Sequence, residues 1–182
     1  MPPLATIVVV SDLDSLRATA HPIRLRLLSL TTGAAMSAAE AARDLGVSQA
    51  SASYHFRVLE RAGLVRVVEV VKVRGGEAKR YRHESSAQPF DVDAPHERLP
   101  LEDRQLYVEA LVDELRRRSA LRIDGPALST DAELWIAPEL WRRVVHHIGQ
   151  ATTVLHAGAQ RPRTPGTVPV SMTLSMFPLR KP

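Results

Sequence analysis

The feature that most constrains the fold is a pair of short helices whose ends are marked by four residues. Ser37 and Glu40 have the spacing of a capping box, in which both side chains accept backbone amide hydrogens at a helix N-terminus. Gly46 ends that helix, and Ser48 is the N-cap of the next one. The sequence therefore predicts two helices that are joined by a tight turn.

The second helix of the pair has one apolar face and one small, polar face. It runs from about residue 49 to residue 62, and Ala52, Phe56 and Leu59 recur at the spacing of a single buried stripe. His55 lies beside this stripe, where we expect it to be packed or to touch a phosphate. Helical periodicity places on the opposite face Ala50, Ser53, Tyr54 and Arg57.

Further helices and a hairpin surround this pair. Asp12 or Asp14 caps a helix over residues 12–20, and the next helix begins at His21–Pro22 and ends at Gly33. After the pair, a valine-rich run and a basic segment flank a Gly-Gly turn. This pattern predicts a hairpin with strands over residues 64–73 and 78–83 and a turn over residues 74–77.

This order of elements is that of a winged helix-turn-helix domain, whose second helix enters the DNA major groove by its N-terminus. Glutamine and serine can hydrogen-bond base edges there. Arginines further along the helix, and basic residues of the hairpin, are placed for contacts with phosphates or the minor groove. The predicted DNA-binding residues are Ser48, Gln49, Ser51, Ser53, Tyr54, Arg57, Arg74, Lys79 and Arg80.

The sequence resembles the ArsR/SmtB family of bacterial winged-helix regulators. The family pattern is carried by residues 16–28 (LRATAHPIRLRLL), by residues 41–65 (AARDLGVSQASASYHFRVLERAGLV) and by the Gly-Gly wing, and it covers about residues 12–84. The resemblance implies a homodimer that binds a partly palindromic operator, usually as a repressor. The groove-facing residues of the family map to Gln49, Ser51, Ser53 and Tyr54.

The chain departs from the family where many of its members bind metal. Those members use a cysteine-containing motif at the start of the helix that here follows Met36, and this chain contains no cysteine. The histidines of the C-terminal half, His146, His147 and His156, do not give a matched ligand pair at helical spacing. We therefore predict no metal site and no cofactor.

The charge of the chain is unevenly distributed. Residues 1–84 contain 12 Lys and Arg against 8 Asp and Glu, whereas residues 85–182 contain 12 of each, so only the first half favours a polyanionic partner. No glycine-rich phosphate loop, G-x-S-x-G or H-E-x-x-H motif supports an enzyme. The short apolar run over residues 7–10 cannot span a bilayer, and no signal peptide is predicted, so we expect a cytoplasmic, nucleoid-associated protein.

The second half predicts two helices and irregular connections. A helix over residues 101–122 carries a stripe of Leu101, Val108, Leu111 and Leu115. A helix from Pro138 to about His156 carries a seam of Trp141, Val144, Val145, Ile148, Ala151 and Leu155. Short strands are expected over residues 4–10, 134–136 and 168–177, the last because apolar and polar residues alternate.

Together these patterns predict an α+β fold with three parts. The parts are a winged helix-turn-helix domain (residues 11–84), a linker (residues 85–97) and an α+β extension for dimerisation or ligand sensing (residues 98–182). The candidate dimer surfaces are the helices over residues 12–20 and 101–122 and the terminal strands. The strand over residues 4–10 pairs with that over 168–177 either within one chain or across two.

The expected function is that of a sequence-specific, double-stranded DNA-binding transcriptional regulator, a repressor that acts as a homodimer. The alternative is a small-molecule-responsive regulator in which the extension holds an effector. Its ligand-binding walls are Trp135 and Trp141, with Met172 and Met176. A purely dimer-stabilising extension explains the same residues.

Overall fold

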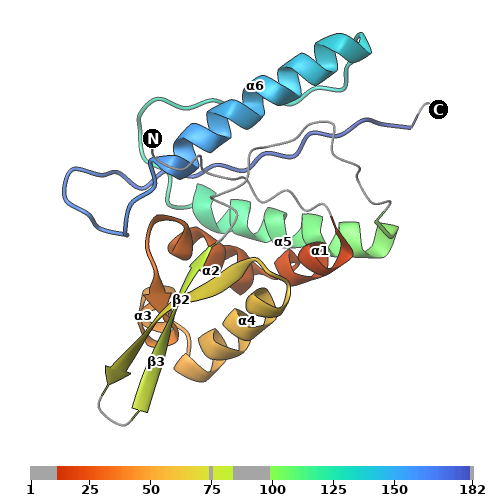
Figure 1. Ribbon diagram of the computed structural model, residues 1–182. Coiled ribbons are helices and arrows are strands. Elements are labelled where there is room, and N and C mark those ends of the chain that lie inside the picture. Colours follow the sequence, from red (N-terminus) through yellow and green to blue (C-terminus); the bar gives the residue numbers. More distant parts are fainter. Residues whose placement is uncertain (1–11, 74–75, 84–98, 181–182) are drawn as a thin grey trace.

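The computed structural model describes residues 12–73, 76–83 and 99–180 (Figure 1). The helices of the first half are α1 (Leu13–Thr19), α2 (Pro22–Gly33), α3 (Ala38–Leu45) and α4 (Gln49–Arg61). The extension contributes α5 (Leu101–Ser119) and α6 (Pro138–Ala157). Each of these helices was predicted, and its bounds agree with the prediction to within a few residues.

A small antiparallel sheet forms the wing. Its strands are β1 (Met36–Ser37), β2 (Val65–Val73) and β3 (Gly76–His83), in the order β1–β3–β2. The hairpin of β2 and β3 was predicted, whereas β1 was not, because two residues carry no periodicity. Met36 lies opposite Tyr81, so β1 joins the start of α3 to the base of the wing.

Local capping explains where the first helices begin. The Asp12 carboxylate accepts a hydrogen bond from Ser15 N at 2.8 Å, which decides between the two candidate caps of α1. Pro22 occupies the first turn of α2, where its missing N–H costs nothing. The Nδ1 atom of His21 accepts from Ile23 N at 3.1 Å and so caps α2.

The hydrophobic core lies between α1–α4 and the sheet. Leu27, Phe56 and Leu59 are completely buried there. The ring of Phe56 stacks on that of Tyr81, with centroids 4.4 Å apart and planes inclined by 8°. This contact packs α4 against β3, so the core fixes α4 relative to the wing.

Helix α5 lies between the helix-turn-helix unit and α6 (Figure 1). It packs on α1, where Arg17 Nε donates to Asp103 Oδ1 at 2.8 Å. Its buried side chains are Ala110 and Glu114. The apolar stripe expected on this helix therefore does not face the core, and three of its four residues are exposed, namely Leu101, Val108 and Leu115.

The prediction of two strands in the extension is wrong. Residues 134–136 and residues 168–177 form no strand in the part of the chain that the structure describes. Alternation of apolar and polar residues gives a strand only where a neighbouring edge accepts its hydrogen bonds. Here the carbonyl of Met172 instead accepts from Arg118 Nη1 at 3.0 Å. The α+β class is confirmed, but its described strands all belong to the wing.

Some expectations lie outside the described residues. These are the strand over residues 4–10, the hairpin-turn residue Arg74 and the linker over residues 85–97. Among the helices that the structure describes, none is both long enough and apolar enough to cross a membrane.

Candidate nucleic-acid interface

The turn between α3 and α4 is built by the residues that the sequence singled out. The capping box is present, because Ser37 Oγ accepts from Glu40 N at 3.2 Å and the Glu40 carboxylate accepts from Ser37 N at 2.8 Å. Gly46 has a φ of 68°, a left-handed conformation that glycine adopts without strain. Ser48 Oγ then accepts from Ser51 N at 3.1 Å and begins α4.

Helix α4 presents a buried side to the core and a polar side to the outside. Ala52, Phe56 and Leu59 have no exposed surface, which confirms the predicted stripe. On the other side Gln49 is exposed, and Ser53 is partly exposed. The helix therefore offers small polar side chains at its N-terminal end, where a recognition helix reads base edges.

The aromatic and basic side chains further along α4 line a shallow hollow. Its volume is about 400 Å³, and it is lined by Tyr54, Arg57, Glu60 and Arg61. Tyr54 is 54% exposed, and Arg57 Nε donates to Ser53 O at 3.3 Å. This bond holds the Arg57 guanidinium along the helix.

His55 is packed inside the protein, which decides between the two roles expected for it. Its ring lies 4.5 Å from that of His21 and 5.2 Å, edge-on, from that of Tyr54. Burial, followed by the charges of His21 and Arg24, lowers the pKa of His55, so the ring is neutral near neutral pH. The sequence predicted that a helix begins at His21–Pro22, but it did not identify His21 as the cap of that helix. Its position directly before Pro22 is the signal that could have identified it.

Of the two described β3 residues predicted to contact DNA, one is exposed and the other is bound internally. Lys79 is exposed. Arg80 instead donates to Ala35 O at 2.7 Å and pairs with Glu40 at 3.6 Å and with Glu69 at 3.5 Å. Arg80 therefore ties the wing to the start of α3, and Lys79 is the described residue of the pair that is available to a phosphate.

Glu40 joins three parts of the molecule and was expected only as a cap. Besides Ser37 and Arg80, it accepts from Arg161 Nη2 at 3.2 Å. Burial alone raises the pKa of Glu40, but the hydrogen bonds from Ser37 and the charges of Arg80 and Arg161 outweigh it and lower this pKa. Glu40 is therefore ionised at neutral pH.

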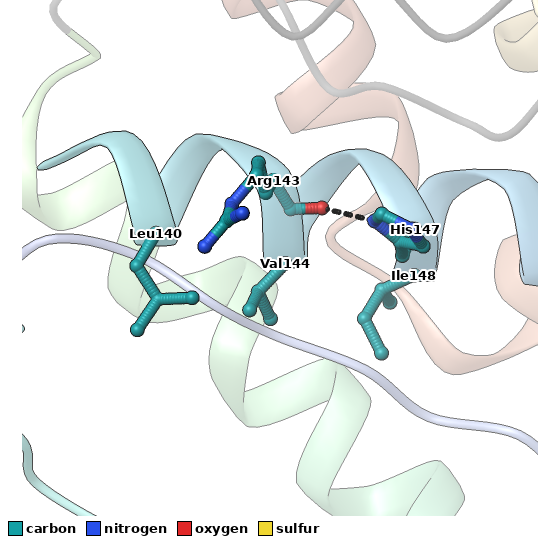
Figure 2. A pocket seen from close by; sticks show the side chains of 5 residues that line it. All are labelled: Leu140, Arg143, Val144, His147 and Ile148. Carbon is teal, nitrogen blue, oxygen red and sulfur yellow. Dashed lines mark hydrogen bonds between the residues drawn. The ribbon is translucent and has the colours of Figure 1, made fainter.

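The residues expected to hold a small molecule line neither the hollow beside α4 nor the groove on α6. Trp135 is 76% exposed on an irregular segment, and Trp141 is half-buried on α6. A groove of about 270 Å³ lies on α6 instead and is lined by Leu140, Arg143, Val144, His147 and Ile148 (Figure 2). Within the described ranges, no cluster of three or more potential ligand residues is placed to hold a metal ion.

One comparison with known proteins bears on this geometry. A family model described as a helix-turn-helix domain matches residues 19–68, from the last residue of α1 to the first part of β2. No curated protein matches the chain. The matched range contains α2, α3, the turn and all of α4. The chain therefore contains a helix-turn-helix domain, a type of domain that is typical of DNA-binding regulators and is generally not enzymatic.

Proposed function

We propose that this chain is a sequence-specific, double-stranded DNA-binding transcriptional repressor of the ArsR/SmtB type. The observation that carries the proposal is the orientation of α4, whose apolar side is fully buried while its polar N-terminal half is open. In this proposal Gln49, Ser51, Ser53 and Tyr54 read base edges, and the phosphates are contacted by Ser48, Arg57 and Lys79.

Replacement of Gln49 by alanine tests base reading. We expect Gln49→Ala to weaken binding to operator DNA by about 1–3 kcal/mol, because alanine cannot make the two hydrogen bonds that a glutamine forms with an adenine. Binding to a random duplex of the same length is expected to change little. The measurement is a gel-shift titration of the DNA upstream of the chain's own gene, repeated in a salt series.

The matched control is Gln150→Ala, which removes the same side chain at an exposed position of α6. This control is expected to bind both duplexes like the wild-type chain. Equal losses of Gln49→Ala on operator and random DNA would show that Gln49 does not read bases.

The proposed repressor is a homodimer, and α5 offers the surface for it. Leu101, Val108 and Leu115 are spaced by seven residues, and all are exposed in the single chain, as is Val112. Such spacing places them on one narrow stripe, as in the seam of a coiled coil. A two-fold axis through this stripe presents two α4 helices to two half-sites of a palindrome, about one DNA turn apart.

A charge placed in this stripe is expected to separate the subunits. Val108→Glu buries a carboxylate in the proposed seam, so we expect a dimer by sedimentation velocity to become a monomer, with loss of operator binding. The control is Val170→Glu on an exposed segment of the extension, which is expected to leave the mass unchanged. A Val108→Glu chain that sediments like the wild type would place the dimer surface elsewhere.

A small-molecule-responsive regulator is the second candidate, and the groove on α6 favours it. Figure 2 shows Leu140, Val144 and Ile148 projecting from one side of the helix. At about 270 Å³ the groove is at the lower limit of a small-molecule site and suits an apolar ligand. Saturable ligand binding that weakens operator affinity would support this function, and binding without that effect would not.

A further inference from the structure

The loop that follows α6 returns to the helix-turn-helix unit and contacts α3. Arg161 Nη2 lies 3.2 Å from Glu40 Oε1, and Arg163 Nη1 lies 2.9 Å from Asp44 Oδ1. The two acidic residues are four positions apart and therefore share one face of α3. Residues 159–164, which we name the return loop, thus place two guanidinium groups on the first helix of the helix-turn-helix.

The return loop is held by a close backbone contact with the end of α2 as well as by its ion pairs with α3. A Cβ atom added at Gly33 would lie 2.3 Å from the carbonyl oxygen of Gln160, so only glycine leaves room for the loop at the end of α2. Pro162 and Thr164 are partly buried. The contact is therefore more than two exposed ion pairs, which by themselves hold a loop weakly.

The return loop has a defined shape. The carbonyl of Arg161 accepts from Thr164 N at 3.2 Å and from Thr164 Oγ1 at 2.7 Å. Arg163 has a φ of 65°, a left-handed conformation that is uncommon for arginine. This turn holds the backbone in the conformation from which Arg163 reaches Asp44.

The position of the two acidic residues gives these contacts a consequence for DNA. In helix-turn-helix complexes the first helix crosses the phosphate backbone, and here that helix is α3. Glu40 caps α3 through Ser37 N and is ionised. Two carboxylates on this helix repel phosphates over distances up to the screening length, about 8 Å at physiological salt. Arg161 and Arg163 supply the balancing positive charges.

We propose that the return loop is a third element of the DNA-binding surface, besides α4 and the wing. Arg161 and Arg163 neutralise the carboxylates of α3. Their side chains are 58% and 77% exposed, unlike that of Arg80 at 24%, so they remain open to the phosphate backbone as well. This inference rests on the proposed DNA-binding function. In this inference the C-terminal extension contributes directly to DNA affinity, and its contribution does not depend on the base sequence.

The test uses the full chain with both charges of the loop removed. The variant is Arg161→Gln with Arg163→Asn, because asparagine readily adopts the left-handed conformation of residue 163. We expect about tenfold weaker binding to operator and random duplexes alike, and a salt dependence that is shallower by about one to two ion contacts. The measurement is fluorescence anisotropy with labelled duplexes over a salt series.

The matched control removes two arginines from exposed positions elsewhere in the extension, as Arg122→Gln with Arg142→Gln. It changes the net charge equally and is expected to weaken binding by less than about threefold, with the salt dependence unchanged. If the return-loop variant binds like the wild type, or like this control, the inference is overturned.

A second variant moves the loop without changing any charge. Gly33→Ala introduces a Cβ atom that the Gln160 backbone excludes, so we expect the same direction of loss on both duplexes, with the helical circular dichroism retained. Wild-type affinity in Gly33→Ala would contradict the proposed role of the contact between Gly33 and the return loop. A wild-type chain that binds neither duplex overturns the proposed function itself, whereas wild-type binding with unaffected return-loop variants overturns this inference alone.

Discussion

Phe56→Ala is expected to lower the free energy of unfolding by about 3–5 kcal/mol, which is the usual cost of removing a fully buried phenylalanine. Phe56 has no exposed surface, and its ring stacks on Tyr81 at 4.4 Å. The substitution removes both the buried area and the contact between α4 and β3. Because small domains are stable by about 5–15 kcal/mol, this loss leaves a marginal domain.

Urea denaturation followed by circular dichroism measures this change. Tyr54→Ala is the matched control, since it removes an aromatic ring two positions earlier on the same helix, from a side chain that is 54% exposed. We expect Tyr54→Ala to cost about 1 kcal/mol or less. A loss below about 1 kcal/mol for Phe56→Ala would show that this ring does not anchor α4 to the wing.

The helix-turn-helix unit was predictable because its signals are local. The capping box of Ser37 and Glu40, the left-handed Gly46 and the cap at Ser48 each act within a few residues of chain. The stripe of α4 follows from helical periodicity alone. Signals of this kind survive whatever packs around them, so element bounds and the polar face of α4 could be derived before any coordinates.

The contacts between distant parts of the chain could not be derived. Arg161 and Glu40 are separated by 121 positions, and no pattern in either segment indicates that it contacts the other. Arg80 shows the same limit, since composition identifies a basic residue on the wing but not its acceptors at Ala35 and Glu69. A basic residue in a segment that is expected to bind DNA is therefore not always available to a phosphate.

The two strands expected in the extension, unlike those of the wing, were predicted wrongly for a related reason. The alternation over residues 168–177 describes a chain with one apolar side, but a strand also needs a partner edge, which the sequence does not specify. The stripe of α5 illustrates the same ambiguity, because periodicity identifies an apolar side without identifying what covers it. Val108 lies on the open side of the helix, whereas Glu114 is buried beside Arg117.

A second large effect is expected from pH and arises at His83. Burial, assisted by the charge of His156, lowers the pKa of His83 from 6.5 to about 4. The ring is 2% exposed on β3, and its Nδ1 lies 3.1 Å from Thr32 Oγ1. That hydroxyl already donates to Leu28 O, so it accepts from His83 Nδ1, which fixes the neutral tautomer.

The sign of the effect follows from proton binding in the two states. As the pH falls below 6.5 the unfolded chain protonates His83 while the folded chain does not, so the free energy of unfolding decreases. The decrease continues until the pH reaches the folded pKa of about 4, and the contribution of His83 over this window is about 3 kcal/mol. Above pH 6.5 this contribution is fully retained.

His83→Gln isolates this contribution, because glutamine keeps an amide donor for Thr32 but does not titrate. Urea denaturation of both proteins over a series of pH values from about 7 to about 4 is expected to show a wild-type curve that falls more steeply. Burial lowers the pKa of His21 and of His55 as well, so these residues give both proteins a slope of the same sign, and the difference reports on His83. His147→Gln, on the exposed side of α6, is the control and is expected to follow the wild type. Parallel curves for wild type and His83→Gln would mean that the buried ring takes up its proton in the folded state as readily as in the unfolded one.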